Sequence, residues 1–206
     1  MYKGDIMKKL FNYILILFMV VGNTYLLIND LNHNDNSRVP TYLSLYALLL
    51  IPTIMKKVIK FKISTEIEIV YFIFILLAQF LGSGVNLYAY ISWFDTFTHF
   101  LSGVLTCFVA LILLHLFGNN PKRKIAFHIT YILGIVFLIA CLWEFFEFGM
   151  DQLAGMNLQH SIESGVTDTM CDILAAFSGS ILFLCAYTYE MLSNTKGFIT
   201  KFIDSL

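Results

Sequence analysis

Pairs of ionisable residues occur in three short segments of an otherwise apolar chain. Two of the pairs are carboxylates, and the third is a carboxylate with a histidine. Within each segment the polar residues are three or four positions apart, so that on a helix they would share one face. The residues that could bind an ion or react are Asp95, His99, Glu144, Glu147, Asp168 and Asp172. Clustered carboxylates in a low-dielectric environment repel one another unless protons or a cation compensate. The spacing therefore predicts a site for a divalent metal ion.

An oxygen-rich donor set with one imidazole suits Zn²⁺, Mg²⁺, Mn²⁺ or Ca²⁺. We expect all six residues to be candidate ligands, with Glu144 and Glu147 also the candidate catalytic carboxylates and His160 a reserve ligand. A metal ion in such a site could activate water or polarise a phosphoryl or carbonyl oxygen. The Glu-x-x-His unit of bundle proteins with two metal ions is absent from the three segments.

A purely structural interpretation of part of this pattern stays open. Asp95 is also a good N-cap residue, and Asp168 would be favoured by the dipole at a helix N-terminus. The remaining four residues lie inside or at the edge of apolar stretches, where ionisable groups are costly and usually functional.

The composition shows which kind of protein positions these residues. Of 206 residues, 58% are hydrophobic and 13% are charged, with a mean hydropathy of +0.76. Ordinary soluble domains are roughly 45–50% apolar and roughly 25% charged. The chain is therefore expected to be an integral membrane protein. A net charge of −1 gives no support to nucleic-acid binding.

A membrane-spanning helix needs roughly 20 mostly apolar residues. Six stretches fit, and they predict an all-α, six-helix membrane bundle forming a single domain over residues 1–206. The expected spans are about 10–28, 41–55, 66–91, 95–117, 124–148 and 166–192. The first span is expected to be a retained anchor, since no small-residue cleavage site follows it. Residues 198–203 could add a short interfacial helix.

The basic residues predict the orientation. With six spans, all Lys and Arg residues except Arg38 fall on one side of the membrane: Lys3, Lys8, Lys9, Lys56, Lys57, Lys60, Lys62, Lys122, Arg123, Lys124, Lys196 and Lys201. Positive residues favour the cytoplasmic side, so both termini are expected there, in a bacterial cytoplasmic (inner) membrane. The three acidic segments would then all lie at the outer leaflet.

Small residues continue two of the acidic faces. Ser102, Gly103 and Thr106 follow His99, and Ala175, Ala176 and Gly179 follow Asp172. Because small residues let membrane helices approach closely, we expect these faces to be packing faces.

The three segments resemble a known family. The motifs are Asp95-x-x-x-His99-Phe100-x-x-Gly103, Glu144-x-x-Glu147 and Asp168-Thr169-x-x-Asp172. Over residues 65–185 they are similar to the YjdF-like family of small bacterial inner-membrane proteins, and less closely to VanZ-like proteins. The resemblance implies a bacterial envelope protein with six spans whose motif acids matter, and it supplies neither a reaction nor a substrate.

Three functions remain open from the sequence. The first is a metal-dependent membrane enzyme, a hydrolase for example, acting on a lipid or lipid-linked envelope substrate. The second is an ion-coupled transporter, since acids within membranes often mark ion paths. The third is a non-catalytic module that binds a cation or a partner protein.

Overall fold

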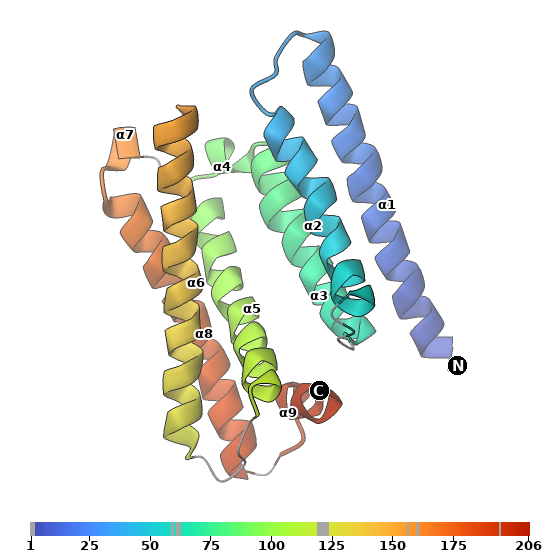
Figure 1. Cartoon of the computed structure of the whole chain (residues 1–206), viewed down its shortest axis with the longest axis vertical. Helices are drawn as coiled ribbons and strands as arrows, with labels where there is room; N and C mark the ends of the chain where they lie inside the picture. The colour runs from blue at the N-terminus through green and yellow to red at the C-terminus, as the bar shows by residue number, and fades with distance from the viewer. Residues whose placement is uncertain are drawn as a thin grey trace. The chain divides into compact units, whose positions relative to one another are not determined.

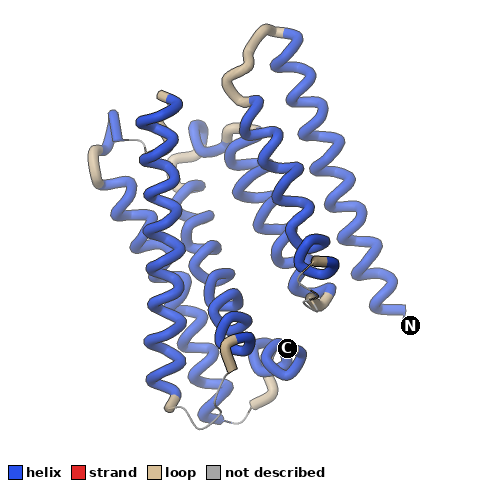
Figure 2. The backbone as a smooth tube through the Cα atoms, in the orientation of Figure 1, coloured by secondary structure: helices blue, strands red, loops and turns tan. Residues whose placement is uncertain are grey.

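The computed structural model describes residues 3–58, 60, 63–118, 124–155, 157–159, 161–193 and 195–206. Throughout these residues the regular structure is helical, and no strand occurs among them (Figure 2). The elements are α1 (Lys3–Asn32), α2 (Val39–Lys57), α3 (Thr65–Ile75), the π-helix η1 (Leu76–Gly84), α4 (Leu87–Tyr90), α5 (Phe94–Leu116), α6 (Ile125–Ala154), α7 (Ser161–Ser164), α8 (Thr167–Ser193) and α9 (Phe198–Ser205) (Figure 1).

Six helical stretches of the described chain are long and apolar enough to cross a membrane, which confirms the predicted number of spans. They are Gly4–Asn32, Val39–Lys57, Thr65–Gly84, Phe94–Leu116, Ile125–Leu153 and Thr167–Ser193. Lys62, Lys122 and Arg123, which contributed to the predicted orientation, lie outside the described residues.

The third span differs from the prediction. One span over 66–91 was expected, with a kink or a break near Gly82–Gly84 and Asn86 left open, and in the structure α3 changes into η1 at Leu76 and the helix ends at Gly84. Asn86 then adopts a left-handed backbone with φ of 69°, and α4 follows. The Tyr88 hydroxyl donates to the Ala78 carbonyl at 3.0 Å, and its ring lies where a Cβ on Gly82 would be. The chain thus turns back onto η1, which a continuous helix could not do.

The helices form two compact units, Met1–Asp95 and Thr96–Leu206. In the first unit, α1, α2, α3 and η1 surround an apolar core of Leu15, Met19, Leu45, Leu49, Phe72, Ile75 and Phe80. Ion pairs join the start of α3 to both of its neighbours: Lys8 of α1 pairs with Glu66, and Lys56 of α2 pairs with Glu68 at 2.5 Å. These pairs fix one end of the three helices.

The second unit contains α5, α6 and α8, with α6 and α8 lying side by side (Figure 1). The expected short C-terminal helix is present as α9, whose Ile199 and Phe202 are buried. The Phe202 ring meets that of Phe108 on α5 at 5.0 Å between centroids. The Glu190 carboxylate of α8 accepts from the Thr200 backbone N–H at 2.8 Å, which fastens the start of α9.

Candidate metal site

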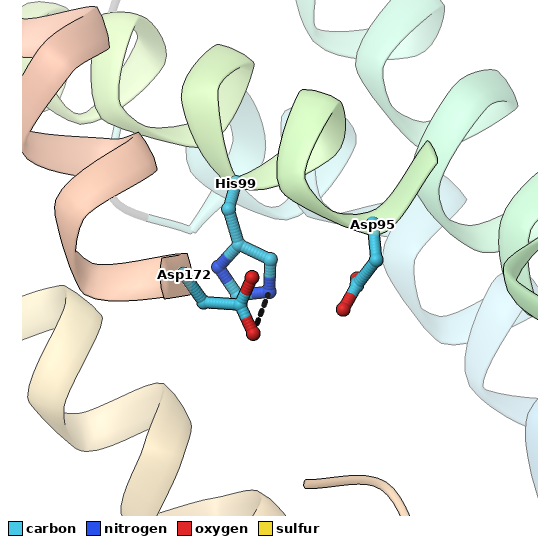
Figure 3. A group of neighbouring side chains, drawn as sticks. All are labelled: Asp95, His99 and Asp172. Atoms are coloured by element: carbon cyan, nitrogen blue, oxygen red, sulfur yellow. Dashed lines mark ion pairs between the residues drawn. The ribbon is translucent and has the colours of Figure 1, made fainter. Parts of the chain in front are cut away.

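The structure brings three of the six predicted residues together. Asp95 and His99 lie one turn apart at the start of α5, and Asp172 projects towards them from α8 (Figure 3). The His99 Nε2 atom is 3.8 Å from Asp172 Oδ2, and one ligand atom from each of the three residues lies within 4.8 Å of the others. Asp172 is only 2% exposed. These two carboxylates and one imidazole form a compact and largely buried donor group.

Close backbone packing brings α5 to α8. A Cβ on Gly103 would overlap the carbonyl of Ala176, and a Cβ on Gly179 would overlap the carbonyl of Phe100. The predicted small-residue faces therefore do meet, because two glycines leave room for the opposing backbones. His99 and Asp172 each precede this contact by one helical turn, at Gly103 and Ala176 respectively, so the crossing places their side chains opposite one another.

The division between the two units falls inside the first turn of α5. Asp95 is the last residue of the first unit, but it belongs to the same continuous helix as His99. Its place next to His99 therefore follows from helix geometry alone.

Glu144 lies on α6, outside the group of three, and is 5% exposed. Its carboxylate accepts from Gln159 Nε2 at 3.3 Å and from the Thr169 side chain. Thr169 is three residues before Asp172 on α8, so Glu144 contacts the helix that carries this residue. Glu144 is therefore a neighbour of the site rather than a member of the compact group.

Glu147 and Asp168 are also outside the group of three. Glu147 is 9% exposed, and its carboxylate accepts from the indole N–H of Trp143 at 2.7 Å. Asp168 lies in the first turn of α8, where a negative charge is favoured by the helix dipole. His160, the reserve ligand, lies outside the described residues.

Sequence reasoning missed Gln159, which lies in the connection between α6 and α8. Its amide Nε2 is within hydrogen-bonding distance of both Glu144 and Thr169, the latter at 3.1 Å. Asp151 supports the same connection by accepting from the backbone N–H of Leu158 at 2.6 Å. A neutral amide in a loop belongs to no helical face, so spacing gave no signal for it.

Comparison with known proteins gives one family match. The family described as "Predicted membrane protein (DUF2238)" matches residues 11–192, a range that extends from the first span to the last and includes all three acidic motifs. No curated protein and no solved structure gives a match. The resemblance to the YjdF-like family is consistent with this result. The chain is therefore a member of the DUF2238 family of predicted membrane proteins.

Proposed function

We propose that this multi-pass membrane protein binds one divalent metal ion through Asp95, His99 and Asp172, and that the ion supports hydrolysis of a lipid or lipid-linked substrate. The observation that carries the proposal is the meeting of Asp172 with the Asp95–His99 pair of α5, with one ligand atom of each within 4.8 Å of the others. Two helices distant in sequence thus contribute to one donor group.

The donor chemistry and the spacing support this assignment. Catalytic zinc sites use three protein ligands and leave a position open, and their nitrogen and oxygen ligands lie about 2.0–2.2 Å from the ion. Such ligand atoms are at most about 4.4 Å apart, so a small side-chain movement would close the present group around an ion. Mg²⁺, Mn²⁺ and Ca²⁺ also favour carboxylate oxygens. The proposal does not select among these four metals.

The distribution of positive charge also supports a cation. Between residues 96 and 193 the only Lys and Arg residues are Lys122, Arg123 and Lys124, which connect the far ends of α5 and α6. The acidic residues lie at the opposite ends of these helices. The Lys and Arg residues of this stretch are therefore far along the sequence from the acids at the opposite helix ends, and a bound cation would add positive charge beside those acids.

The remaining acids have distinct proposed roles. A bound divalent ion would polarise a phosphoryl or carbonyl oxygen and activate water. Glu144, buried beside α8, would accept a proton at its carboxylate as the general base. Glu147, held by Trp143, and Asp168, at the start of α8, would add negative charge around the ion or help to bind it.

The proposed orientation follows from the basic residues. Both termini would be cytoplasmic, in a bacterial inner membrane, because all Lys and Arg residues except Arg38 would then face the cytoplasm. The start of α5, the end of α6 and the start of α8 would lie at the outer leaflet. The site would therefore be accessible to lipid headgroups and lipid-linked envelope precursors.

One observation favours a second candidate function, an ion-coupled transporter. A buried His128–Tyr187 pair lies towards the other ends of α6 and α8, with the His128 Nδ1 atom 2.6 Å from the Tyr187 hydroxyl. Ser180, fully buried, lies between Tyr187 and Asp172 along α8. Polar groups thus continue beyond the acidic end, as an ion path requires. Ion flux into proteoliposomes that is abolished by Asp172→Asn would favour this function over hydrolysis.

Metal content is the first test. Protein purified in detergent without chelator, with Asp172→Asn as the test variant and Asp204→Asn as the control, would be assayed by elemental analysis. Asp204 is an exposed acid of α9 that pairs with Lys196, so its loss removes the same charge away from the site. We expect about one metal ion per chain in the parent and the control and none in Asp172→Asn. A well-folded parent that takes up none of the four metals would overturn the proposal.

The catalytic part has its own test. The metal-loaded parent and Glu144→Gln would be screened against lipid and lipid-phosphate substrates. Glu144→Gln is expected to keep its metal at saturating concentration and to lose turnover by about 10²–10⁴-fold, as expected for removal of a general base. Turnover by a metal-free protein would contradict the assigned role of the ion.

A further inference from the structure

The connection between α6 and α8 is joined to the candidate site by one amide. Gln159 Nε2 lies 3.1 Å from Thr169 Oγ1, 3.3 Å from Glu144 Oε2 and 3.4 Å from the Glu144 carbonyl oxygen. An amide nitrogen carries two hydrogens and can only donate. It therefore bridges the Glu144 carboxylate of α6 to the hydroxyl of Thr169 on α8.

Asp151 fixes the backbone that carries this amide. One carboxylate oxygen accepts from the Leu158 N–H at 2.6 Å, and the other accepts from the Gln159 N–H at 3.1 Å. The helix ends just beyond Asp151, where the N–H of Gly155, in a left-handed conformation with φ of 65°, bonds to the Asp151 carbonyl at 3.1 Å. Gly155 thus ends α6, and the Asp151 carboxylate holds the connection that follows it.

Glu144 and Asp151 are seven residues apart on α6, which is close to two helical turns. They therefore lie on the same helix face, with Gln159 fixed by both of them. These residues form a chain of hydrogen bonds. The Asp151 carboxylate accepts from the backbone N–H of Gln159, and the Gln159 side-chain amide donates to the Glu144 carboxylate and to Thr169.

We propose that Gln159 is a positioning residue for Glu144, holding its carboxylate against α8 at Thr169, three residues before the ligand Asp172. This inference rests on the proposed function, because it assigns Glu144 a role next to a metal ion. Without the amide, the carboxylate could adopt other rotamers, and its charge would be less well placed to favour the ion. The contribution of Glu144 to ion binding would therefore depend on its hydrogen bond with Gln159.

A loop-stabilising role for Gln159 makes a different prediction. In that case Gln159→Met would destabilise the connection whether or not residue 144 is charged. If Gln159 acts through Glu144, its loss has no further effect on the ion once the charge of Glu144 is gone. A double-mutant cycle separates the two cases.

The metal arm of the experiment measures Mn²⁺ affinity in detergent by titration calorimetry for the parent, Gln159→Met, Glu144→Gln and the double variant. Partners outside the ligand group typically contribute 10–100-fold to metal affinity. We expect each single variant to weaken Mn²⁺ binding by about tenfold and the double variant to bind no more weakly than Glu144→Gln. The matched control is Gln152→Met, which removes an exposed amide from α6, the helix that carries Glu144. This variant should leave the Mn²⁺ affinity unchanged. Additive losses in the double variant would overturn the inference.

A second arm needs no metal. The infrared carboxylate stretching band of Glu144 would be identified in the metal-free protein as the band that Glu144→Gln removes. Loss of a hydrogen-bond donor changes the frequency of such a band, so we expect it to shift in Gln159→Met and to stay in place in Gln152→Met. An unshifted band in Gln159→Met would overturn the inference.

The two arms distinguish the two possible failures. A parent that binds none of Zn²⁺, Mg²⁺, Mn²⁺ and Ca²⁺ contradicts the proposed function, while a shifted band in that same protein still supports the contact between Gln159 and Glu144. Conversely, tight Mn²⁺ binding with an unshifted band supports the metal site and removes Gln159 from it.

Discussion

Charged residues at the ends of the spanning helices are arranged differently in the two units. In the first unit, the acids at the start of α3 are each paired with a lysine of a neighbouring helix, Glu66 with Lys8 and Glu68 with Lys56. In the second unit, Lys196 pairs with Asp204 after α8. The acids at the end of α6 and the start of α8, in contrast, belong to a stretch, residues 96–193, whose only Lys and Arg residues are at 122–124. The same residue types thus join helices in one unit and form a candidate cation site in the other.

Glycine packing shows a parallel difference. In the first unit, the atoms nearest to a Cβ on Gly22 would be those of the Phe80 ring, a side chain that can shift without moving a helix backbone. In the second unit, a Cβ on Gly103 would meet the backbone of Ala176, which cannot move without shifting α8. A glycine that faces a side chain tolerates substitution better than one that faces a backbone. Gly103, at the helix crossing next to the site, should therefore tolerate substitution less well than Gly22.

The largest expected effect tests that difference in packing. Gly103→Ala should lower the free energy of unfolding by about 3 kcal/mol, the upper part of the range for overpacking, because α5 and α8 must separate. Gly22→Ala should cost about 1 kcal/mol or less, since Phe80 can move and alanine favours the helix. Reversible unfolding in mixed micelles would measure both. Equal losses would show that the two contacts do not differ in rigidity.

The next effect concerns the ion. A ligand at 100 times its Kd stabilises the state that binds it by about 2.7 kcal/mol. We expect saturating metal to raise the free energy of unfolding of the parent by this amount and that of Asp172→Asn not at all. Glu66→Gln, which removes an acid from the first unit, should keep the full increase. If Glu66→Gln abolished the increase, the assignment of the site to α5 and α8 would be wrong.

The smallest effect concerns the ion pairs of the first unit. Lys56→Gln should cost about 0.2–1 kcal/mol, because its side chain is 40% exposed and solvent screens such pairs. The charge-reversed pair, Lys56→Glu with Glu68→Lys, should regain most of that loss, and the metal affinity should stay unchanged in both variants. A drop in metal affinity on breaking the pair would remove the contrast between the units.

Much of the fold could be predicted because spanning a membrane constrains length and composition. Each of the six spans is an apolar stretch that composition alone reveals. The end of the third span could be predicted only in part, because Gly82, Ser83, Gly84 and Asn86 interrupt the apolar stretch and fit either a kink or a break there. The change to a π-helix and the left-handed Asn86 depend on contacts such as that of Tyr88 with Ala78, which the sequence does not display.

The candidate site was predictable in part for a similar reason. Helical spacing places Asp95 beside His99, and the glycines after His99 and Asp172 indicate where the two helices meet. Which acids join them depends on how each helix is rotated about its axis. Glu144 lies against Thr169 and Gln159, while Glu147 accepts from Trp143, and spacing alone does not distinguish these two neighbours on α6.

The π-helix η1 has a consequence for how the length of this chain can vary. Each π-type hydrogen bond spans five residues instead of four. The segment Leu76–Gly84 therefore contains more residues than an α-helix of the same length along its axis. A one-residue deletion there can be absorbed by conversion to α-helical turns. Deletions elsewhere in a spanning helix rotate every following side chain by a quarter of a turn or more. Relatives of different length would therefore be expected to carry their insertions and deletions in this segment and to keep the helices that follow it in register.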